Sequence, residues 1–257
     1  MENSKIIIYE DPNFECYRDD KIGILKIKKN VFEIITDLQK SYRFIKCINL
    51  LEKDDNISAI VIFNEKNSLG NKEYINYLNR VSSHKRIENQ FGDTRSINNI
   101  TRTREHVILN NIISKIVKSC KIIVNASNGE IVTPFFGLAL AADLRFATDE
   151  TIFYLSHSQM NVHPNGALPY FLPKLLGYSK ASQILLCSDQ ITAQEALDLG
   201  ILLEILPEEK FEEICITEVK KIIARGDNAL KCTIKMLSTN FKNLREYTNM
   251  EECEFAR

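Results

Sequence analysis

The sequence predicts an α/β fold built around a parallel β-sheet. Short apolar runs of strand length alternate with longer amphipathic stretches through the first half of the chain. Strands that alternate with helices are typical of parallel sheets, because each parallel pair needs a crossover connection. The length of 257 residues and the hydrophobic content of 44% suit one large domain, or one domain with an appendage, around a sizeable core.

The first elements are three strands and a helix. The strands, with turns between them, are expected at Ile6–Tyr9, Phe14–Tyr17 and Ile22–Lys28. The next stretch, Phe32–Leu51, has helical periodicity. The face expected to be buried comprises Phe32, Ile35, Leu38, Tyr42, Ile45 and Ile48.

The rest of the chain continues the alternation and then becomes helical. Further strands are expected at Ser58–Phe63, Lys121–Asn125, Leu144–Ala147 and Ile152–Leu155, with an amphipathic helix at Ile100–Val117. From Leu168 onward the pattern is mainly helical, apart from Ile201–Leu206. The segment Asn64–Asn99 is polar, rich in Lys and Arg, and weakly periodic. It fits a solvated loop, or a mobile lid that meets a phosphate-bearing ligand.

Composition excludes several classes of function. The formal net charge of −1 gives no global field that would attract nucleic acid, and no apolar run approaches the length of a membrane span. The start of the chain lacks the pattern of a signal peptide. None of the seven cysteines is paired at CxxC spacing, so we expect buried free thiols, no metal site and a cytoplasmic protein.

The stretch "IVTPFFGLALAADLRFA", which runs from Ile131 to Ala147, carries an unusual helix start. Proline is favoured at the first helical position, so Pro134 is expected to open the helix with Thr133 as its N-cap. The helix is expected to end at Asp143. A helix start offers free N–H groups to an anion, but proline has no N–H to offer.

The longer stretch "KIIVNASNGEIVTPFFGLALAADLRFA" resembles the signature of the enoyl-CoA hydratase/isomerase (crotonase) superfamily. In that family a strand ends in Asn-Gly, and a Gly-Gly-Gly turn then opens a helix. The resemblance continues in "NVHPNGALPYFLPKLLGYSKASQILLCSDQITAQEALDLGILLEILP" and in "NALKCTIKML", whose motifs stand in family order. It covers most of the chain and is weakest between Asn64 and Asn99.

The resemblance implies a crotonase-like β-β-α spiral with a helical carboxyl-terminal segment that mediates trimer formation. We therefore expect a spiral core over residues 1–206 and a helical segment over 207–257. It also implies an acyl thioester ligand of coenzyme A or of an acyl carrier protein, no further cofactor, and a homotrimer or dimer of trimers. Two backbone N–H groups of relatives hold the thioester oxygen as an oxyanion hole.

The resemblance also shows where this chain departs from the family. The three family glycines fall on Thr133, Pro134 and Phe135, and the middle one donates the second N–H in relatives. Pro134 cannot donate, so the N–H of Phe135 is the expected substitute. At the first oxyanion loop the donor is expected to be the N–H of Leu69. Pro134, Phe136 and Gly137 are expected to line the acyl pocket, although the phenylalanines equally fit a role as core residues.

The acid and base positions differ as well. The two glutamates with which hydratases activate water match Gly137 and His157, and a third family position matches Asn165. His157 and Asn165 are thus the candidate catalytic residues, since imidazole titrates near neutral pH. The alternatives are a structural histidine and an Asn-Gly turn. Lys72, Lys231 and Lys235 are candidates for binding coenzyme A phosphates, or are solvated surface residues.

Two functions from different classes remain open. The first is an enzyme of enolate chemistry, such as an isomerase, a decarboxylating lyase or a C–C hydrolase, that does not use two-glutamate hydration. The second is a catalytically silent crotonase fold used for binding or assembly, which Pro134 and the missing glutamates favour. We favour the enzyme, because His157 and the family framework are retained.

Overall fold

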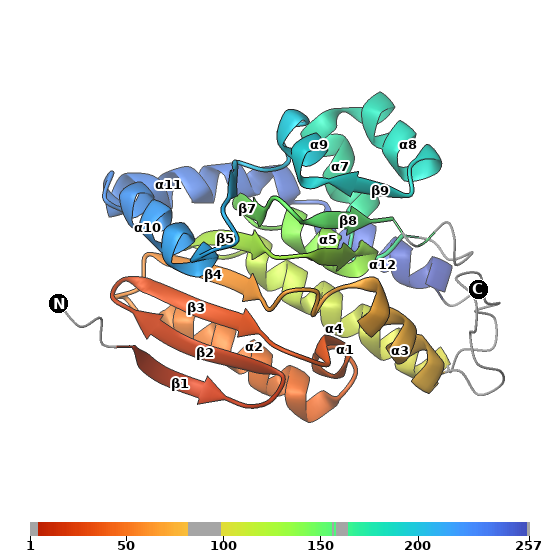
Figure 1. The fold of residues 1–257 in the computed structure, drawn as a ribbon, viewed down its shortest axis with the longest axis horizontal. Coiled ribbons are helices and arrows are strands. Elements are labelled where there is room, and N and C mark those ends of the chain that lie inside the picture. Colours follow the sequence, from red (N-terminus) through yellow and green to blue (C-terminus); the bar gives the residue numbers. More distant parts are fainter. Residues whose placement is uncertain (1–4, 82–98, 156, 158–163, 256–257) are drawn as a thin grey trace.

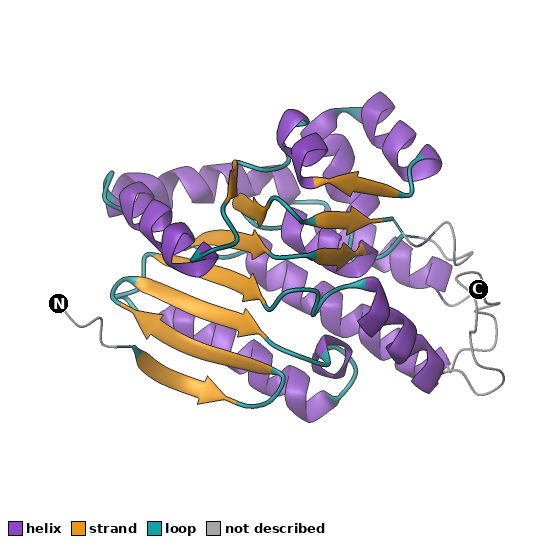
Figure 2. Ribbon diagram, in the orientation of Figure 1, coloured by secondary structure: helices purple, strands orange, loops and turns teal. Residues whose placement is uncertain are grey.

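The computed structural model describes residues 5–81, 99–155, 157 and 164–255. These residues form a mixed α/β fold in which one large twisted sheet carries helices on its faces (Figures 1 and 2). This agrees with the predicted fold class. The segment Asn64–Asn99, expected to be a solvated loop or a lid, contains a helix, α3 (Asn71–Val81), and its residues 82–98 lie outside the described residues.

The large sheet has seven strands, and five neighbouring strands of it are parallel. Its order is β1 (Ile6–Glu10), β2 (Phe14–Asp19), β3 (Ile22–Ile27), β4 (Ala59–Asn64), β5 (Ile122–Ser127), β7 (Leu144–Thr148) and β10 (Glu204–Leu206). Strand β2 pairs in the antiparallel direction with both β1 and β3. The neighbouring strands β3, β4, β5, β7 and β10 run parallel to one another. A small second sheet contains β6 (Glu130–Val132), β8 (Ile152–Tyr154) and β9 (Gln190–Thr192).

The remaining helices connect the strands or follow the sheet. They are α1 (Val31–Ile34), α2 (Leu38–Lys53), α4 (Asn99–Val117), α5 (Thr133–Leu140), α7 (Leu168–Leu176), α8 (Tyr178–Cys187), α9 (Ala193–Asp198), α10 (Phe211–Ile223), α11 (Asp227–Leu237), the 3₁₀ helix η2 (Ser238–Phe241) and α12 (Leu244–Phe255). Helix α3, strand β6, and strand β9 within the region expected to be helical are elements that the sequence did not predict.

Strand β4 shows how the sheet divides the core. All six of its residues are buried, and successive side chains point to opposite faces. Ile60 and Ile62 join the core that includes α2 and α4, whereas Val61 and Phe63 join a second core with Phe211 of α10. A continuous apolar run of this kind is typical of a parallel strand covered on both faces.

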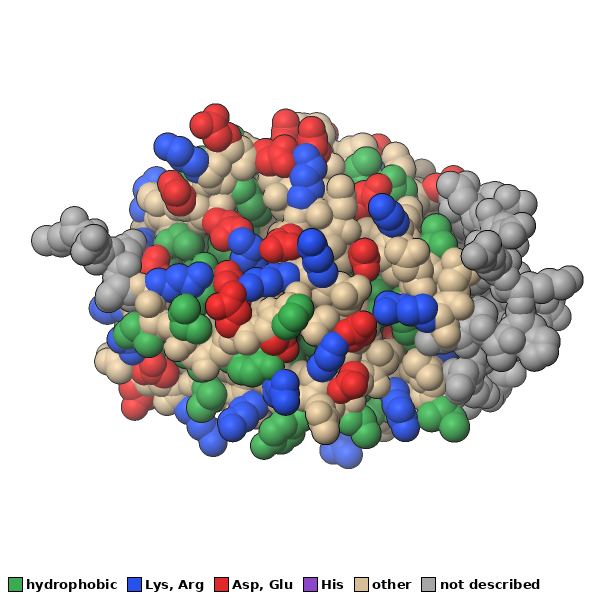
Figure 3. Space-filling model, turned by 60° about the horizontal axis from the view of Figure 1, so that its bottom comes forward, with side chains coloured by type: hydrophobic (Ala, Val, Ile, Leu, Met, Phe, Trp, Pro, Cys, Tyr) green, Lys and Arg blue, Asp and Glu red, His purple; other side chains and the backbone are tan. Residues whose placement is uncertain are grey.

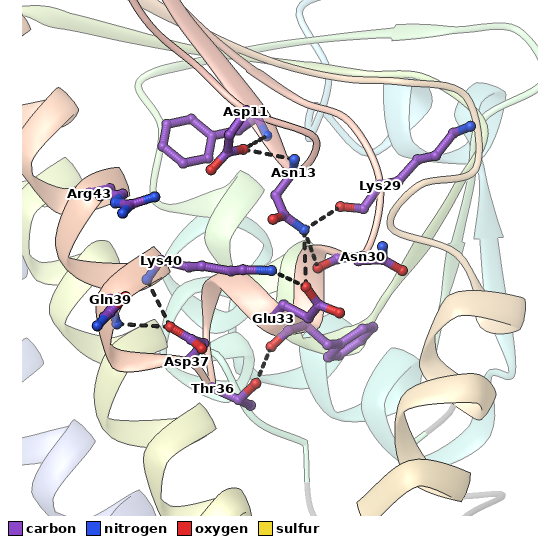
Figure 4. A network of polar contacts seen from close by, with 12 residues as sticks. Asp11, Asn13, Lys29, Asn30, Glu33, Thr36, Asp37, Gln39, Lys40 and Arg43 are labelled. Carbon is purple, nitrogen blue, oxygen red and sulfur yellow. Dashed lines mark hydrogen bonds and ion pairs between the residues drawn. The ribbon is translucent and has the colours of Figure 1, made fainter.

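The predicted helix Phe32–Leu51 is broken into two, which corrects the expected buried face. The carboxylate of Asp37 caps α2 by accepting hydrogen bonds from the backbone N–H groups of Gln39 (2.8 Å) and Lys40 (3.0 Å). Leu38 and Tyr42 consequently point outward and are 61% and 66% exposed. Figure 4 shows this cap within a polar network in which Lys40 also contacts Glu33 of α1.

The helix that opens with Pro134 is also shorter than expected. It ends at Leu140, and Asp143 lies beyond it. The Asp143 carboxylate accepts a hydrogen bond from the N–H of Ile123 at 2.8 Å, while the Asp143 N–H donates to the Ile123 carbonyl at 2.9 Å. Burial raises the pKa of Asp143 to about 6. Asp143 therefore anchors the turn between α5 and β7 to the start of β5.

The cysteines are free, but only part of them are buried. Cys16, Cys47 and Cys215 are buried; Cys120, Cys187, Cys232 and Cys253 are exposed, contrary to the expectation of burial. Over the described ranges, no helix combines the length and apolarity needed to cross a membrane, and no group of three or more His, Cys, Asp or Glu could hold a metal ion. The face in Figure 3 carries cations and carboxylates interspersed.

Candidate active site

The loops that follow β4 and β5 are fastened to each other at the carboxyl edge of the sheet. Asn64 and Asn128 bond reciprocally: Asn64 Nδ2 donates to the Asn128 carbonyl at 2.9 Å, and the Asn128 N–H donates to Asn64 Oδ1 at 3.0 Å. Asn67 Oδ1 accepts from the N–H of Glu130 at 2.9 Å. A Cβ on Gly129 would lie only 2.2 Å from Asn67 Oδ1, so this junction requires glycine.

Leu69 lies beside the strand that leads into α5, as the oxyanion hypothesis requires. It forms a parallel bridge with Ile131, and its carbonyl accepts from the N–H of Val132 at 2.9 Å. The carboxylate of Glu130 reaches the start of α3 and accepts from the N–H of Asn71 at 3.0 Å. The fold thus brings the two predicted oxyanion segments together, with an acidic side chain between them.

The start of α5 differs from the expected capping. Val132 is the N-cap residue, Thr133 is the first helical residue and Pro134 the second. The Thr133 hydroxyl donates to the carbonyl of Tyr154 at 3.2 Å instead of capping the helix. Pro134 has no N–H, so Phe135 is the next backbone donor of this first turn.

Gly137 and Gly166 touch through their backbones on the face of α5 that is expected to line the pocket. A Cβ on Gly137 would lie 1.9 Å from the Gly166 carbonyl oxygen, and one on Gly166 would lie 2.4 Å from the Pro134 carbonyl oxygen. Gly166 has a φ of +69°, a conformation that favours glycine. The space that a side chain at position 137 would need is therefore filled by backbone.

Phe135 and Phe136 are buried in two different aromatic clusters. The Phe135 ring meets Phe32 edge-on at 5.3 Å, and Phe32 stacks on Tyr77 at 4.6 Å. Phe136 is fully buried and stacks on Phe153 of β8 at 4.5 Å. Both rings contribute to the core, and an additional contact between Phe136 and an acyl chain stays a prediction.

His157 is buried beside the first residue of α5. Its Nδ1 lies 3.3 Å from the Thr133 hydroxyl, and its Nε2 lies 3.2 Å from the carbonyl of Leu185. Because a carbonyl only accepts, Nε2 must carry the proton of that hydrogen bond. The geometry leaves Nδ1 facing Thr133, one residue before Pro134. The catalytic role of His157 stays a prediction.

Asn165 belongs to a buried polar cluster that the sequence analysis did not predict. Its Nδ2 donates to Glu105 at 3.3 Å, and Glu105 also accepts from Tyr77 Oη at 2.9 Å. Arg102 forms a buried ion pair with Glu105 at 2.9 Å and donates to Tyr74 Oη at 3.3 Å. A carboxylate only accepts, so Glu105 fixes the orientation of the Asn165 amide.

The electrostatics of this cluster follow from its burial. Burial lowers the pKa of Arg102, but Glu105 together with Tyr74 and Tyr77 outweighs that effect and raises the pKa above its usual range. Burial, together with Glu105, raises the pKa of Tyr77, and burial raises that of Tyr74. Both tyrosines therefore remain neutral beside a paired charge, where Tyr77 donates to Glu105 and Tyr74 accepts from Arg102.

A second buried carboxyl, Glu251 of α12, contacts the same loop. Its Oε1 accepts from the N–H of Ala167 at 3.4 Å, while its Oε2 has no hydrogen-bond partner among the described residues. Burial raises the pKa of Glu251 to about 8, so it is mainly protonated at neutral pH. Glu105 and Glu251 thus bracket the Asn165–Ala167 segment.

Local sequence signals could have found Arg102 and Glu105. They occupy the same stripe of α4 as the buried residues Leu109, Ile112 and Ile116. Charges of opposite sign at spacing i, i+3 on an apolar stripe indicate a buried pair. The contact between Glu105 and Asn165 had no local signal, because it joins residues 60 positions apart.

The predicted phosphate-binding lysines do not form one group. Lys72 is exposed in the first turn of α3, beside the Leu69 loop. Lys231 is half-buried on α11, and Lys235 lies exposed near its end, where it lines a hollow with Lys118, which follows α4. Their roles in binding coenzyme A stay predictions.

The comparisons with known proteins agree on one family. Residues 93–255 match the family model described as enoyl-CoA hydratase/isomerase. Mouse peroxisomal enoyl-CoA delta isomerase 3 is 27% identical over 175 residues, 68% of this chain and 55% of that protein. The trans-2-decenoyl-[acyl-carrier-protein] isomerase of Streptococcus mutans is 22% identical over 208 residues, 80% of this chain and 74% of that protein.

Solved structures show the same fold at low sequence identity. The enoyl-CoA hydratase of Bacillus halodurans superposes with a TM-score of 0.76 at 20% identity, covering 95% of this chain and 96% of that one. The chain spans 55%, 39% and 56% of the length of three mammalian enoyl-CoA delta isomerases.

Proposed function

Since the chain belongs to the enoyl-CoA hydratase/isomerase family, we propose that it moves the double bond of an enoyl thioester, carried by coenzyme A or by an acyl carrier protein, through an enolate. Relatives named as enoyl-CoA delta isomerase and as an acyl-carrier-protein isomerase support this choice within the family.

One observation separates isomerisation from hydration. The backbone contact between Gly137 and Gly166 leaves no room for a glutamate at position 137. Hydration in relatives needs two carboxylates to activate water, and that pair has no counterpart here. Isomerisation needs a single group that removes a proton from C2 and returns it to C4. The reaction that needs fewer acid and base groups is therefore favoured.

The proposed proton carrier is His157, with Thr133 as its hydrogen-bond partner. In the proposed reaction an imidazole nitrogen takes the C2 proton, and the electron pair moves to the thioester oxygen. The N–H groups of Leu69 and Phe135 are proposed to hold that oxygen, since Pro134 cannot donate. Asn165, oriented by Glu105, is proposed to position the acyl chain.

The proposal is tested with 3-enoyl thioesters of several chain lengths, presented as coenzyme A and as acyl-carrier-protein conjugates. Products are separated by chromatography and identified by mass. The expected result is conversion to the 2-enoyl isomer without gain of water, at a rate of roughly 1 per second or more. Efficient hydration of crotonyl-CoA at such a rate would contradict the proposal.

A catalytically silent protein is the second candidate function. It is favoured by Pro134, by the backbone that fills the position of the first glutamate, and by the engagement of both His157 nitrogens. In this case acyl thioesters raise the melting temperature of the protein without being converted. The same set of thioesters, examined by thermal shift and by product analysis, distinguishes the two functions.

We also propose that the helices after Pro207 join neighbouring subunits into a trimer or a dimer of trimers. Helix α12 packs on α4 of its own chain. Large apolar side chains of this segment nevertheless remain exposed: Met236 (65%), Leu237 (52%) and Met250 (55%). Exposed apolar groups on neighbouring helices are typical of an association surface.

A further inference from the structure

A cationic hollow lies between the end of α4 and the turn from α11 through η2 to α12. Its volume is about 560 Å³, within the range of pockets that bind small molecules. Lys118, Lys235, Lys242 and Arg245 line it, and no Asp or Glu does. An adjoining smaller hollow shares Lys118 and Arg245 and contains Glu252.

The positive charge of this hollow is not neutralised by the part of the chain that the structure describes. Among the described residues, none of the four cations forms an ion pair. Glu52 contacts two residues that line the hollow, but its carboxylate is already engaged, because it accepts hydrogen bonds from Ser119 Oγ at 2.5 Å and from the Cys120 N–H at 2.9 Å. Four like charges around one concavity repel each other, and a bound anion would offset this repulsion.

The partial charges of the nearby helix ends offset only a small part of this positive charge. Helices α4 and α11 both end at the hollow, and each carboxyl end carries about half a negative charge. Helix α12 begins there and adds about half a positive charge. An excess of about three and a half positive charges remains, which matches a ligand with two or more negative charges.

The hollow lies at the other end of the sheet from the candidate active site. Cys120 precedes β5, whereas the Asn128–Thr133 segment follows it. Six strand residues at 3.3 Å each separate the two ends by about 20 Å. We propose that the hollow is a second binding site, specific for a small molecule that carries a phosphate or diphosphate group.

Two sources of that group need to be distinguished. One is a free phosphate compound, such as a nucleoside diphosphate. The other is the phosphorylated adenosine end of coenzyme A, extending from a thioester in the active site. We assign the hollow to a free compound, because of the separation across β5. This assignment does not depend on which reaction the active site performs.

Calorimetric titration of the full chain with pyrophosphate and with ADP tests the proposal. The test variant combines Lys242→Gln with Arg245→Gln, two exposed side chains whose replacement leaves the core intact. The control is Lys180→Gln, an exposed cation on α8. We expect wild type and control to bind both probes, with at least ten-fold weaker binding by the double variant.

Three results would overturn the assignment. Pyrophosphate and ADP fail to bind the wild-type protein, as they would if a neighbouring subunit covered the hollow. Alternatively, the double variant binds them as tightly as wild type does. In the third case neither probe binds alone, while the double variant weakens binding of coenzyme A, so that the hollow belongs to the thioester. Circular dichroism confirms that each variant is folded.

Discussion

The carbonyl oxygen of Gly166 lies where the side chain of residue 137 would begin: a Cβ on Gly137 would be 1.9 Å from it. The two glycines thus depend on each other. The Asn165–Ala167 segment packs on α5 only because residue 137 has no side chain, and its backbone leaves no space for one. A single substitution at position 137 therefore cannot place a glutamate there without moving this segment.

Gly137→Glu is therefore expected to destabilise the protein and not to create a hydratase. A contact at 1.9 Å with backbone atoms forces the loop or the helix to move, so we expect a loss of at least about 3 kcal/mol in unfolding free energy. Urea denaturation measures it. The control is Gly177→Ala, at a glycine with φ of +77° and open space around it. That change is expected to cost only about 1–2 kcal/mol. Wild-type stability in Gly137→Glu would show that the loop moves freely.

Pro134→Ala is expected to raise isomerase turnover. The substitution returns a backbone N–H to the first turn of α5, and one oxyanion donor is worth roughly 100-fold in rate. The gain is smaller if the Phe135 N–H already holds the oxygen. Pro169→Ala is the matched control, since Pro169 is likewise the second residue of its helix, α7. A lower kcat in a folded Pro134→Ala protein would contradict the hypothesis that the oxyanion lacks a backbone N–H donor at position 134.

His157→Ala is expected to reduce kcat by roughly 100-fold or more, because a positioned general acid or base contributes about that factor. Turnover of the accepted 3-enoyl thioester is the measurement. The control is His106→Ala, at a buried histidine on α4 whose Nε2 lies 2.9 Å from Asn110. Full activity of His157→Ala alongside a folded circular dichroism spectrum would assign the imidazole a structural role.

Stability is expected to fall between pH 5 and 8 because of Glu251. Burial raises the folded-state pKa of this carboxyl from 4.5 to about 8, so the folded protein retains a proton that the unfolded chain releases. The stabilisation is complete below about pH 4.5 and is lost as the pH rises through 8. The difference between the unfolded-state and folded-state pKa values corresponds to about 5 kcal/mol of unfolding free energy.

Glu251→Gln keeps the hydrogen-bond acceptor but cannot ionise. We expect it to remove this slope in the unfolding free energy measured by urea denaturation between pH 6.5 and 8. This window lies above the pKa of about 6 to which burial raises Asp143. Equal slopes in wild type and Glu251→Gln would mean that α12 moves away from Ala167 when Glu251 ionises.

Sedimentation is expected to show a trimer or a dimer of trimers. The combination of Met236→Glu and Leu237→Glu places charge on the exposed apolar end of α11 and is expected to shift the protein toward monomer. Leu186→Glu, at a residue of α8 that is 80% exposed, serves as the control. A wild-type protein that sediments as a monomer would remove the assembly proposal.

The sequence by itself determined the alternation of strands and helices, the family and the unusual helix start. These depend on local signals: the apolar run of β4 predicts a strand covered on both faces, and motifs in order predict the family. The break in the helix also had a local signal, because Asp37 is a residue type favoured at the N-cap. The helical spacing of apolar residues continues across Asp37, however, and concealed this signal.

Only the tertiary structure decided which side chains meet at the candidate site. Gly137 and Gly166 are adjacent because a loop from after β8 folds over α5, and Glu105 meets Asn165 because α4 passes beneath that loop. The spacing of apolar residues in one helix or strand indicates which of its faces is buried. It does not indicate which other element packs against that face. The contacts that fill the glutamate position and orient Asn165 therefore follow from packing between distant segments.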